Sequence, residues 1–407
     1  MSRSSTALML FPLVLGLGCD PEPEPVPDPP GELSVGCEDS AYRQIHSAAR
    51  AAGAGDVVEV CSGTYEAGII IDDAFALVAA EGAEVVVEAD DDEIGLQIAL
   101  PPGVSGTARL AGMSFPGVER AGLIQLSGPS NATIELQDVS AHTLKITGSA
   151  AYSIADATFA DSELGWGIDA ALTDGATVAL TNVVLTDHAE AAIALRATGD
   201  ECAPDAPDTL GLSADGLLIR DAAVGIIDVP DEDYVGIGVG CEAKLEVVLA
   251  DTDFESVTQV IDTRWIDGPL HDMTLRNVTI EGGLVEGLTT SGAVLTIEGL
   301  TYTGAVAPLM TVDGVNLDVA AVSGLRLYNN TTAQALVRMY ESWLAARAAP
   351  LECALCDMGT GDTANVSAEL SIVELEGEVL VPAVAGSPWD FDGEIRWACS
   401  DAGCAAL

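Results

Sequence analysis

The chain has 407 residues, of which 49% are hydrophobic and only 4% aromatic, and 15 basic against 64 acidic residues give a formal net charge of −49. The apolar content excludes an acidic disordered chain, and the shortage of cations excludes a nucleic-acid-binding face. The sequence has no apolar run of the roughly 20 residues that a membrane-spanning helix needs. A large, folded, acidic body remains, with a core of small aliphatic side chains.

The segment 1–18 has the features of an export signal. Arg3 precedes an apolar stretch over residues 7–18, which is too short to span a bilayer and has the length of a signal-peptide core. Residues 15–19 read LGLGC, which resembles the processing site of a bacterial lipoprotein. The resemblance implies cleavage before Cys19, lipidation of its thiol, and contact with a membrane through acyl chains. The alternative is an ordinary secretory signal followed by a spare cysteine.

Residues 19–36 are expected to form the lipidated cysteine and a tether. Proline and acidic residues alternate between Asp20 and Pro30, which favours an extended, self-repelling chain. At about 3.1 Å per residue, this segment would hold the folded body roughly 30 Å from a lipid surface. We therefore expect a location in the cell envelope, facing the periplasm or the cell surface.

A short pattern recurs along the body of the chain. Each unit has an apolar residue, a spacer, then Asn, Asp or Gly, two further residues and another apolar one. The units begin at Leu110, Leu136, Ile154, Leu180, Ala214, Leu249, Leu275, Ile297 and Val322. Most starts are about 22–26 residues apart, and this spacing, with alternating apolar residues around it, predicts one turn of a parallel β-solenoid per unit.

The third residue of each unit is expected to turn a corner between two short strands. Asn, Asp and Gly are the residues that tolerate the left-handed backbone that such a corner needs. The nine predicted corner residues are Gly112, Asp138, Asp156, Asn182, Gly216, Asp251, Asn277, Gly299 and Gly324. About ten to twelve coils would stack with roughly 4.8 Å between strands.

The segment before the repeats predicts a cap. Residues 42–52 form a short amphipathic pattern, with Ile45 and Ala48 on its apolar face, and lead into AGAGDVVEVCSGTYEAGIIID at residues 52–72. This arrangement resembles the opening of bacterial right-handed parallel β-helix proteins of the pectate-lyase-like superfamily, and residues 384–394 resemble their closing segment. The resemblance implies an all-β fold, a single-stranded right-handed parallel β-helix over residues 37–395 with an N-terminal capping helix and a cysteine-containing tail over 396–407.

The cysteines fit an exported protein. Lipidation of Cys19 leaves eight of nine cysteines, and export makes disulfides the default. Proximity in the sequence favours Cys37–Cys61. The two longest coils are adjacent and carry Cys202 and Cys241 in their extra residues, which would project from one side of the rod, so we expect these two to pair.

The C-terminal cysteines allow two interpretations, disulfide bonds or a zinc site. Cys353, Cys356, Cys399 and Cys404 are expected to pair among themselves. The alternative hypothesis is a zinc site at Cys353-x-x-Cys356, which lacks neighbouring histidines. Residues 339–347, between the last repeat and these cysteines, predict a short helix.

Residues that could perform chemistry are few. Hydrolases of the superfamily are similar to one another in an Asn-Thr-Asp strand, an Asp-Asp pair and a Gly-His-Gly, and this sequence lacks that set, so we assign no catalytic residue. The four histidines have no metal-ligand spacing. Weak calcium candidates cluster in the inserts of the long coils, at Asp200, Glu201, Asp205, Asp208, Asp231 and Asp233. Calcium is therefore a cofactor to test, and we assign no other.

These observations favour an exported, lipid-anchored envelope protein that presents a surface to a glycan or protein partner without catalysis. The alternative is a calcium-dependent, polysaccharide lyase-like enzyme. A body of this negative charge would repel anionic polymers, and the chain has few cations with which to line a basic groove. The binding role is therefore the favoured one, with no nucleic-acid partner.

Overall fold

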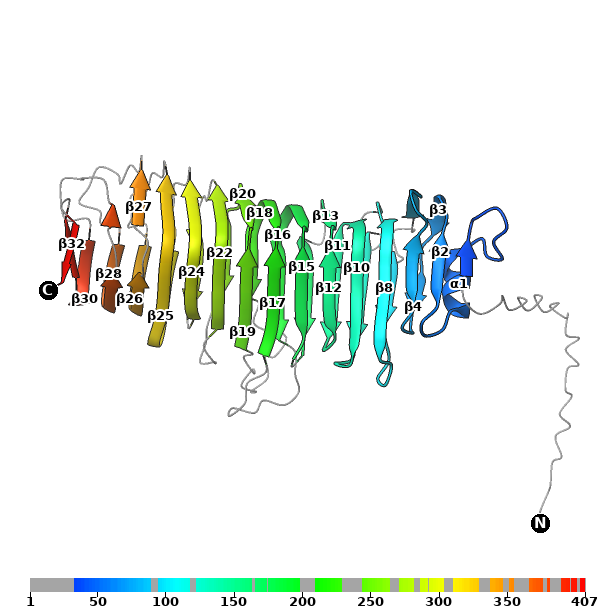
Figure 1. The fold of residues 1–407 in the computed structure, drawn as a ribbon, viewed down its shortest axis with the longest axis horizontal. Coiled ribbons are helices and arrows are strands. Elements are labelled where there is room, and N and C mark those ends of the chain that lie inside the picture. Colours follow the sequence, from blue (N-terminus) through cyan, green and yellow to red (C-terminus); the bar gives the residue numbers. More distant parts are fainter. Residues whose placement is uncertain are drawn as a thin grey trace, which may run out of the picture.

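The computed structural model shows a long right-handed parallel β-helix, with the capping helix α1 (Ile45–Ala51) at one end and the strands β30 (Trp389–Ile395) and β32 (Gly403–Ala406) at the other (Figure 1). The structure describes residues 33–88, 94–117, 122–162, 165–173, 175–197, 209–228, 244–263, 271–281, 286–291, 293–303, 310–328, 337–346, 351–354, 366–375, 379–380, 389–395, 397–400 and 403–406. Each coil has a first, a second and a third strand, and each strand pairs in parallel with its equivalent in the next coil. A long strand bends at a corner and supplies two successive strands of a coil, for example a first and a second strand.

The first strands form one continuous column. It comprises β1 (Leu33–Val35), β2 (Val57–Val60), β5 (Ala76–Ala79), β8 (Gly106–Ser114), β10 (Ala132–Ala141), β12 (Ala151–Ala155), β15 (Thr177–Thr181), β17 (Thr209–Asp215), β19 (Lys244–Ala250), β22 (His271–Glu281), β24 (Ala293–Thr303), β25 (Met310–Tyr328), β26 (Val337–Ala346), β28 (Val366–Leu375) and β30 (Trp389–Ile395). The column is longer than the ten to twelve coils expected, because coils also form before residue 110 and after residue 322. Its first member, β1, lies in the segment expected to be tether.

The other two columns complete the coils. Second strands come from β3 (Gly63–Glu66), β6 (Val85–Glu88), β13 (Thr158–Ala160), β16 (Val184–Ala197), β18 (Leu218–Asp228), β20 (Asp253–Glu255), β27 (Leu351–Ala354), β29 (Val379–Leu380) and the C-terminal parts of β8, β10, β22, β24 and β25. Third strands come from β4 (Ile69–Ile71), β7 (Leu96–Ala99), β9 (Leu123–Gly128), β11 (Thr143–Gly148), β14 (Trp166–Leu172), β21 (Gln259–Thr263), β23 (Glu286–Ser291), the C-terminal parts of β16 and β18, and the N-terminal parts of β25, β26, β28 and β30.

The strand register confirms the sequence repeat. Leu110 pairs with Leu136, and Leu136 pairs with Ile154. The same correspondence continues unit by unit, through both long coils, until Ile297 pairs with Val322. The irregular spacing of the units is therefore the true length of the successive coils.

The corner between the first and second strands also matches the prediction. Asp138, Asp156 and Asn182 each have a φ of 52°, in the left-handed region. Gly112, Gly216, Asp251, Asn277 and Gly299 also have positive φ values, between 45° and 96°. We call these residues the first corner. A second corner, between the second and third strands, was missed: it has positive φ at Asp161, Asp187, Asp221 and Ser256.

The interior is a set of aliphatic ladders, as the low aromatic content predicts. In the third strands, Leu144 pairs with Ile168 and Ile168 with Ile193, and all three side chains are fully buried. The alternate residues of these strands point outward, as the pleat of a strand requires. Among the side chains that the structure describes, large rings such as Phe159 enter the core at a few coils.

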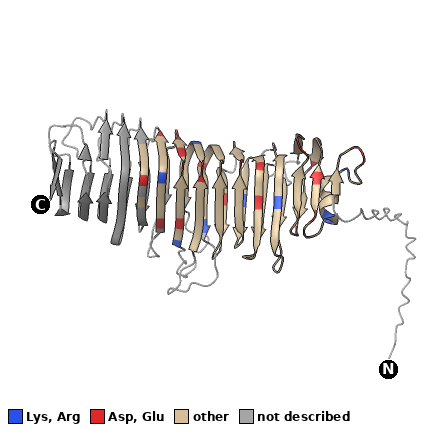
Figure 2. Cartoon of the chain, viewed as in Figure 1, with Lys and Arg blue, Asp and Glu red and all other residues tan. Residues whose placement is uncertain are grey.

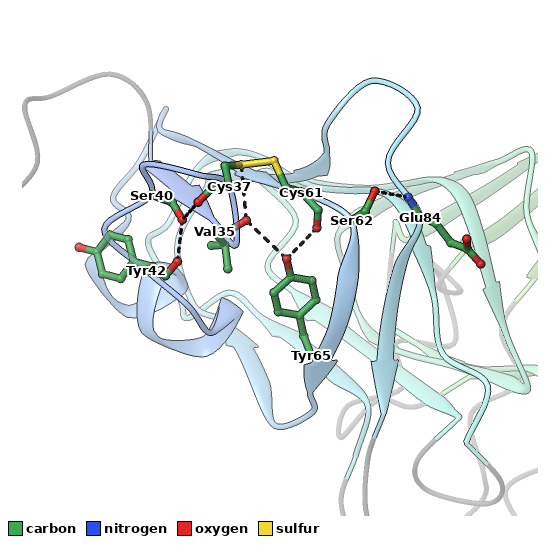
Figure 3. Close-up of a disulfide and its surroundings, with 8 residues drawn as sticks. All are labelled: Val35, Cys37, Ser40, Tyr42, Cys61, Ser62, Tyr65 and Glu84. Atoms are coloured by element: carbon green, nitrogen blue, oxygen red, sulfur yellow. Dashed lines mark hydrogen bonds between the residues drawn. A yellow bond between two sulfur atoms is a disulfide. The ribbon is translucent and has the colours of Figure 1, made fainter.

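A helix covers the N-terminal end of the rod. The helix α1 (Ile45–Ala51) buries Ile45, Ala48 and Ala49 against β1, β2 and β4. It is shorter than the pattern at 42–52 predicts, because Gln44 and Ala52 both have extended backbones. The expected Cys37–Cys61 disulfide is present, with sulfurs 2.11 Å apart, and it joins this cap to the end of β2 (Figure 3).

The helix expected at 339–347 does not form. Residues 337–346 are the strand β26, which pairs in parallel with β25 and β28. Pairing on both sides outweighs the weak local preference of this segment for helix.

Candidate functional site

Most site residues predicted from the sequence lie outside the described residues. This holds for Cys19, Cys202, Cys241 and Cys356 and for all six calcium candidates, Asp200, Glu201, Asp205, Asp208, Asp231 and Asp233. The strands around the two inserts are described. One insert follows β16 and precedes β17, and the other follows β18 and precedes β19. Both therefore connect a third strand to a first strand, so both leave the same edge of the rod.

A cluster of an aromatic, a basic and an acidic side chain lies on the outer face of the third strands beside this edge. We call Trp166, Asp169 and Arg196 the Trp166 cluster. The Arg196 guanidinium carbon lies 4.3 Å from the centroid of the Trp166 ring. Its Nε lies 3.3 Å from Asp169 Oδ1. The cluster therefore combines a cation–π contact with an ion pair.

The strand register explains how these residues meet. Asp169 in β14 pairs with Ala194 in β16, so Arg196 lies two positions further along the neighbouring strand, on the same face. Such diagonal neighbours lie about 7–8 Å apart at their backbones in a pleated sheet, within reach of a long side chain. The Arg196 side chain is 31% exposed and that of Asp169 is 20% exposed.

The charged pair in the cluster lacks complete hydrogen bonding. Asp169 Oδ1 and Arg196 Nε are both shielded from solvent, and neither makes an aligned hydrogen bond among the described residues, despite their separation of 3.3 Å. Shielded polar groups without aligned partners carry a free-energy cost. Trp166 is half-buried.

A row of polar residues leads along the rod to the cluster. On the outer face of successive third strands, Gln97 pairs with Gln125, Gln125 with Lys145, and Lys145 with Asp169. Lys145 is exposed and makes no ion pair within the described part of the chain. Basic positions are sparse along the rod (Figure 2), so two on one face, Lys145 and Arg196, stand out.

The buried histidine of the second corner has a structural setting. His188 is 1% exposed, and its Nε2 lies 3.2 Å from the Phe159 carbonyl oxygen. Burial lowers the pKa of His188, against weaker opposing effects of the Phe159 carbonyl and of Asp187 and Asp161. A neutral imidazole packed in a corner fills space and carries no site chemistry by itself.

Comparisons with known proteins match this chain only distantly. No family model and no curated protein matches the sequence. Among solved structures, the chain is similar to a family 28 exopolygalacturonase of Yersinia enterocolitica, at 11% identity and a TM-score of 0.38 over 90% of this chain and 78% of that one. A mannuronic acid specific polysaccharide family 6 lyase from human gut microbiota has 13% identity and a TM-score of 0.37, over 89% and 87% of the two chains.

A third solved structure, the catalytic domain of a GH87 α-1,3-glucanase in complex with nigerose, has 12% identity and a TM-score of 0.37 over 91% of this chain and 69% of that one. At such identities the likeness concerns the fold alone, which the strand register establishes independently. The site must therefore be judged from its own residues.

The described residues hold neither a metal cluster nor a membrane-spanning helix. No group of three or more His, Cys, Asp or Glu side chains there is placed to hold a metal ion. No helix among them is long and apolar enough to cross a membrane. The described site offers a ring, a guanidinium and a carboxylate, with two amides and an ammonium group leading to them.

Proposed function

We propose that the protein is an exported, lipid-anchored β-helix of the cell envelope that binds a glycan at the Trp166 cluster without transforming it. The observation that carries the proposal is the stacking of Arg196 on Trp166 beside Asp169. Aromatic rings with a few fixed polar groups are the usual lining of a small-molecule site. The apolar face of a sugar ring can stack on the indole, and its hydroxyls can pair with the carboxylate and guanidinium.

The row of Gln97, Gln125 and Lys145 favours an extended ligand. These residues stand on successive coils at roughly 4.8 Å intervals along the rod. A chain of sugars lying along the axis could use each in turn. A compact ligand would contact the Trp166 cluster and none of these three residues.

The position of the site suits an anchor at Cys19. The first strand, β1, lies at the N-terminal end of the rod (Figure 1). The third strand β14 is separated from β4 by β7, β9 and β11, so it stands roughly 20 Å along the rod. A lipid on Cys19 would thus hold the site well away from the membrane surface.

Glycan binding is tested by titrating the full-length protein with sets of neutral and acidic oligosaccharides. Trp166→Ala is expected to weaken binding at least about tenfold, as the loss of one good contact of ~1.4 kcal/mol would. Arg276→Ala is the matched control, because Arg276 makes an exposed ion pair with Glu298 on the first-strand face. Unchanged affinity in Trp166→Ala would rule out this site.

The anchor is tested separately by fractionation. Cys19→Ala is expected to move the protein from the membrane fraction to the soluble one. Membrane retention of that variant would reject lipidation at Cys19 and leave the glycan site standing.

A calcium-dependent lyase-like activity is the second candidate. It is favoured by the position of Arg196, which lies at the end of β16, just before Asp200 in the first long insert. Thermal unfolding with calcium, with magnesium and with chelator tests it, because a ligand that binds only the native state raises the unfolding midpoint. A rise specific to calcium, together with turnover of uronic-acid polymers, would replace the binding role by catalysis.

A further inference from the structure

The C-terminal end of the chain forms a hairpin that differs from the parallel pairs of the rod. The strands β31 (Trp397–Ser400) and β32 (Gly403–Ala406) pair in antiparallel fashion. In their register Ser400 stands opposite Gly403, and Cys399 stands directly opposite Cys404. The register therefore brings together two of the four C-terminal cysteines whose pairing the sequence left open.

The type of this strand pair follows from the length of the connection. Two residues, Asp401 and Ala402, separate Ser400 from Gly403. A two-residue connection makes its flanking residues the first and last of a β-turn, joined by a hydrogen bond from amide to carbonyl. Since hydrogen-bonded and non-hydrogen-bonded pairs alternate along antiparallel strands, Cys399 and Cys404 form a non-hydrogen-bonded pair.

That type of pair suits a disulfide. The Cα atoms of a non-hydrogen-bonded pair lie about 4.5 Å apart, closer than in the alternating type. Disulfides span Cα separations of about 4.4–6.8 Å. The bond can therefore form between the two backbone positions without moving either strand.

We propose that Cys399 and Cys404 form a cross-strand disulfide that locks the hairpin as the C-terminal cap of the rod. The strand β31 lies beside β28, and β32 lies beside β29, in the last coils. In the second column, β29 is the last described strand and pairs only with β27, so β32 lies beside its free edge. Exposed edges of this kind invite pairing with another chain, so a locked hairpin protects the rod from end-to-end association.

The two ends of the rod would then be closed in the same way. At the N-terminal end, the Cys37–Cys61 disulfide ties the segment after β1 to β2 (Figure 3). At the other end, the Cys399–Cys404 disulfide ties β31 to β32. The oxidising environment in the cell rests on the proposed export, whereas the pairing rests on the register.

The bond formation is a two-electron oxidation. The two thiols lose two protons and two electrons and become one S–S bond. A disulfide-bearing oxidoreductase of the envelope would accept the electrons by thiol–disulfide exchange, leaving itself as a dithiol. Glutathione disulfide can take that role in vitro, and it is reduced to two glutathione molecules.

Peptide mapping tests the pairing. The full-length protein is oxidised with glutathione disulfide, blocked with N-ethylmaleimide and cut before aspartates without reduction. The cut separates the two cysteines, because Asp401 lies between them, and it places Cys353 and Cys356 together on peptide 318–356. The expected product is peptide 392–400 linked to peptide 401–407. Maleimide on both peptides, or a link from either to 318–356, would overturn the pairing.

A variant gives a second measurement that does not depend on isolating the linked peptides. In Cys404→Ala, one maleimide is expected to appear on Cys399, with labelling of Cys353 and Cys356 unchanged. New labelling of Cys353 or Cys356 instead would overturn the pairing. If the link forms in vitro but protein extracted from the envelope carries free thiols at 399 and 404, the pairing stands and the proposed export fails.

Discussion

Asn182 donates a hydrogen bond from Nδ2 to Oδ1 of Asp156, 3.0 Å away, at the equivalent corner of the preceding coil. Asn277 makes the same bond to Asp251, further along the rod. Both pairs belong to the first corner, where all four residues have a left-handed backbone. An amide in this corner can therefore tie its own coil to the preceding one, whereas two carboxylates in succession cannot.

Asp156→Asn is expected to stabilise the fold. Asp138 and Asp156 stand in succession at the first corner, so two like charges face one another and neither can donate. The amide could donate to Asp138 while its oxygen still accepts from Asn182. We expect a gain of about 0.5–1.5 kcal/mol in the free energy of unfolding, measured by urea denaturation. The reverse change, Asn182→Asp, should lose a similar amount, and equal stabilities for the two variants would contradict this account.

Stability is expected to decrease as the pH is lowered, through His188. Burial lowers the pKa of this imidazole in the folded state, so folding favours the neutral form. Its contribution is present above the unfolded-state pKa of about 6.5 and is lost as pH falls below that value. The unfolding midpoint should therefore drop more between pH 7.5 and 5.5 in the native protein than in His188→Leu. A His46→Gln variant, which replaces a partly exposed histidine in α1, is the control for the loss of a histidine.

Gly225→Ala is expected to damage the fold where Gly53→Ala does not. A Cβ atom at Gly225 would lie 2.4 Å from the Val260 carbonyl oxygen in the next coil, and a backbone atom there cannot rotate away. We expect a loss of about 1–3 kcal/mol, as for other overpacked interiors. At Gly53 the nearest atom would be Asp56 Oδ2 at 3.9 Å, an ordinary contact. Chemical denaturation of the two variants should separate them clearly.

Removal of the Cys37–Cys61 disulfide is expected to loosen the N-terminal cap. The bond closes a loop with a sequence separation of 24, for which chain entropy predicts a contribution of about 3.5 kcal/mol. The Cys37→Ala/Cys61→Ala variant should show early hydrogen exchange in α1 and β1. If only strands remote from the cap lost protection, the cap would not depend on this bond.

The sequence predicted the coil pattern well because each coil repeats one backbone requirement. Asp156 and Asn182 were recognised as corner residues since a left-handed position restricts the choice of side chain. The same restriction at the second corner could have been found. Its residues Asp161 and Asp187 each follow the first-corner residue of their own coil at the same interval. The residue types next to the second-corner residues vary more from coil to coil, so the second series was not recognised.

The Trp166 cluster could not be predicted. The register pairs Trp166 with Ala191 and places Arg196 further along the same strand, so the spacing of the coils does not bring the two together. Their contact depends on a long side chain reaching diagonally over the outer face. Outward positions carry no periodic signal, because solvent accepts almost any side chain there. The acidic residues of the inserts were conspicuous in the sequence, and they remain a prediction.

Coil length varies widely along the rod, from the short coil between Leu136 and Ile154 to the long one between Ala214 and Leu249, yet the first corner keeps its length. For each pair of neighbouring coils between Gly112 and Gly324, paired residues differ in number by the same amount in the first strands as in the second strands. Differences in length between these coils therefore lie in the other two connections. A residue inserted at the first corner would move the buried side chains of the following strand to its outer face. For protein engineering, the first corner must therefore keep its length. The other two connections of each coil can accept foreign peptides, which would be displayed in tandem at the pitch of the β-helix.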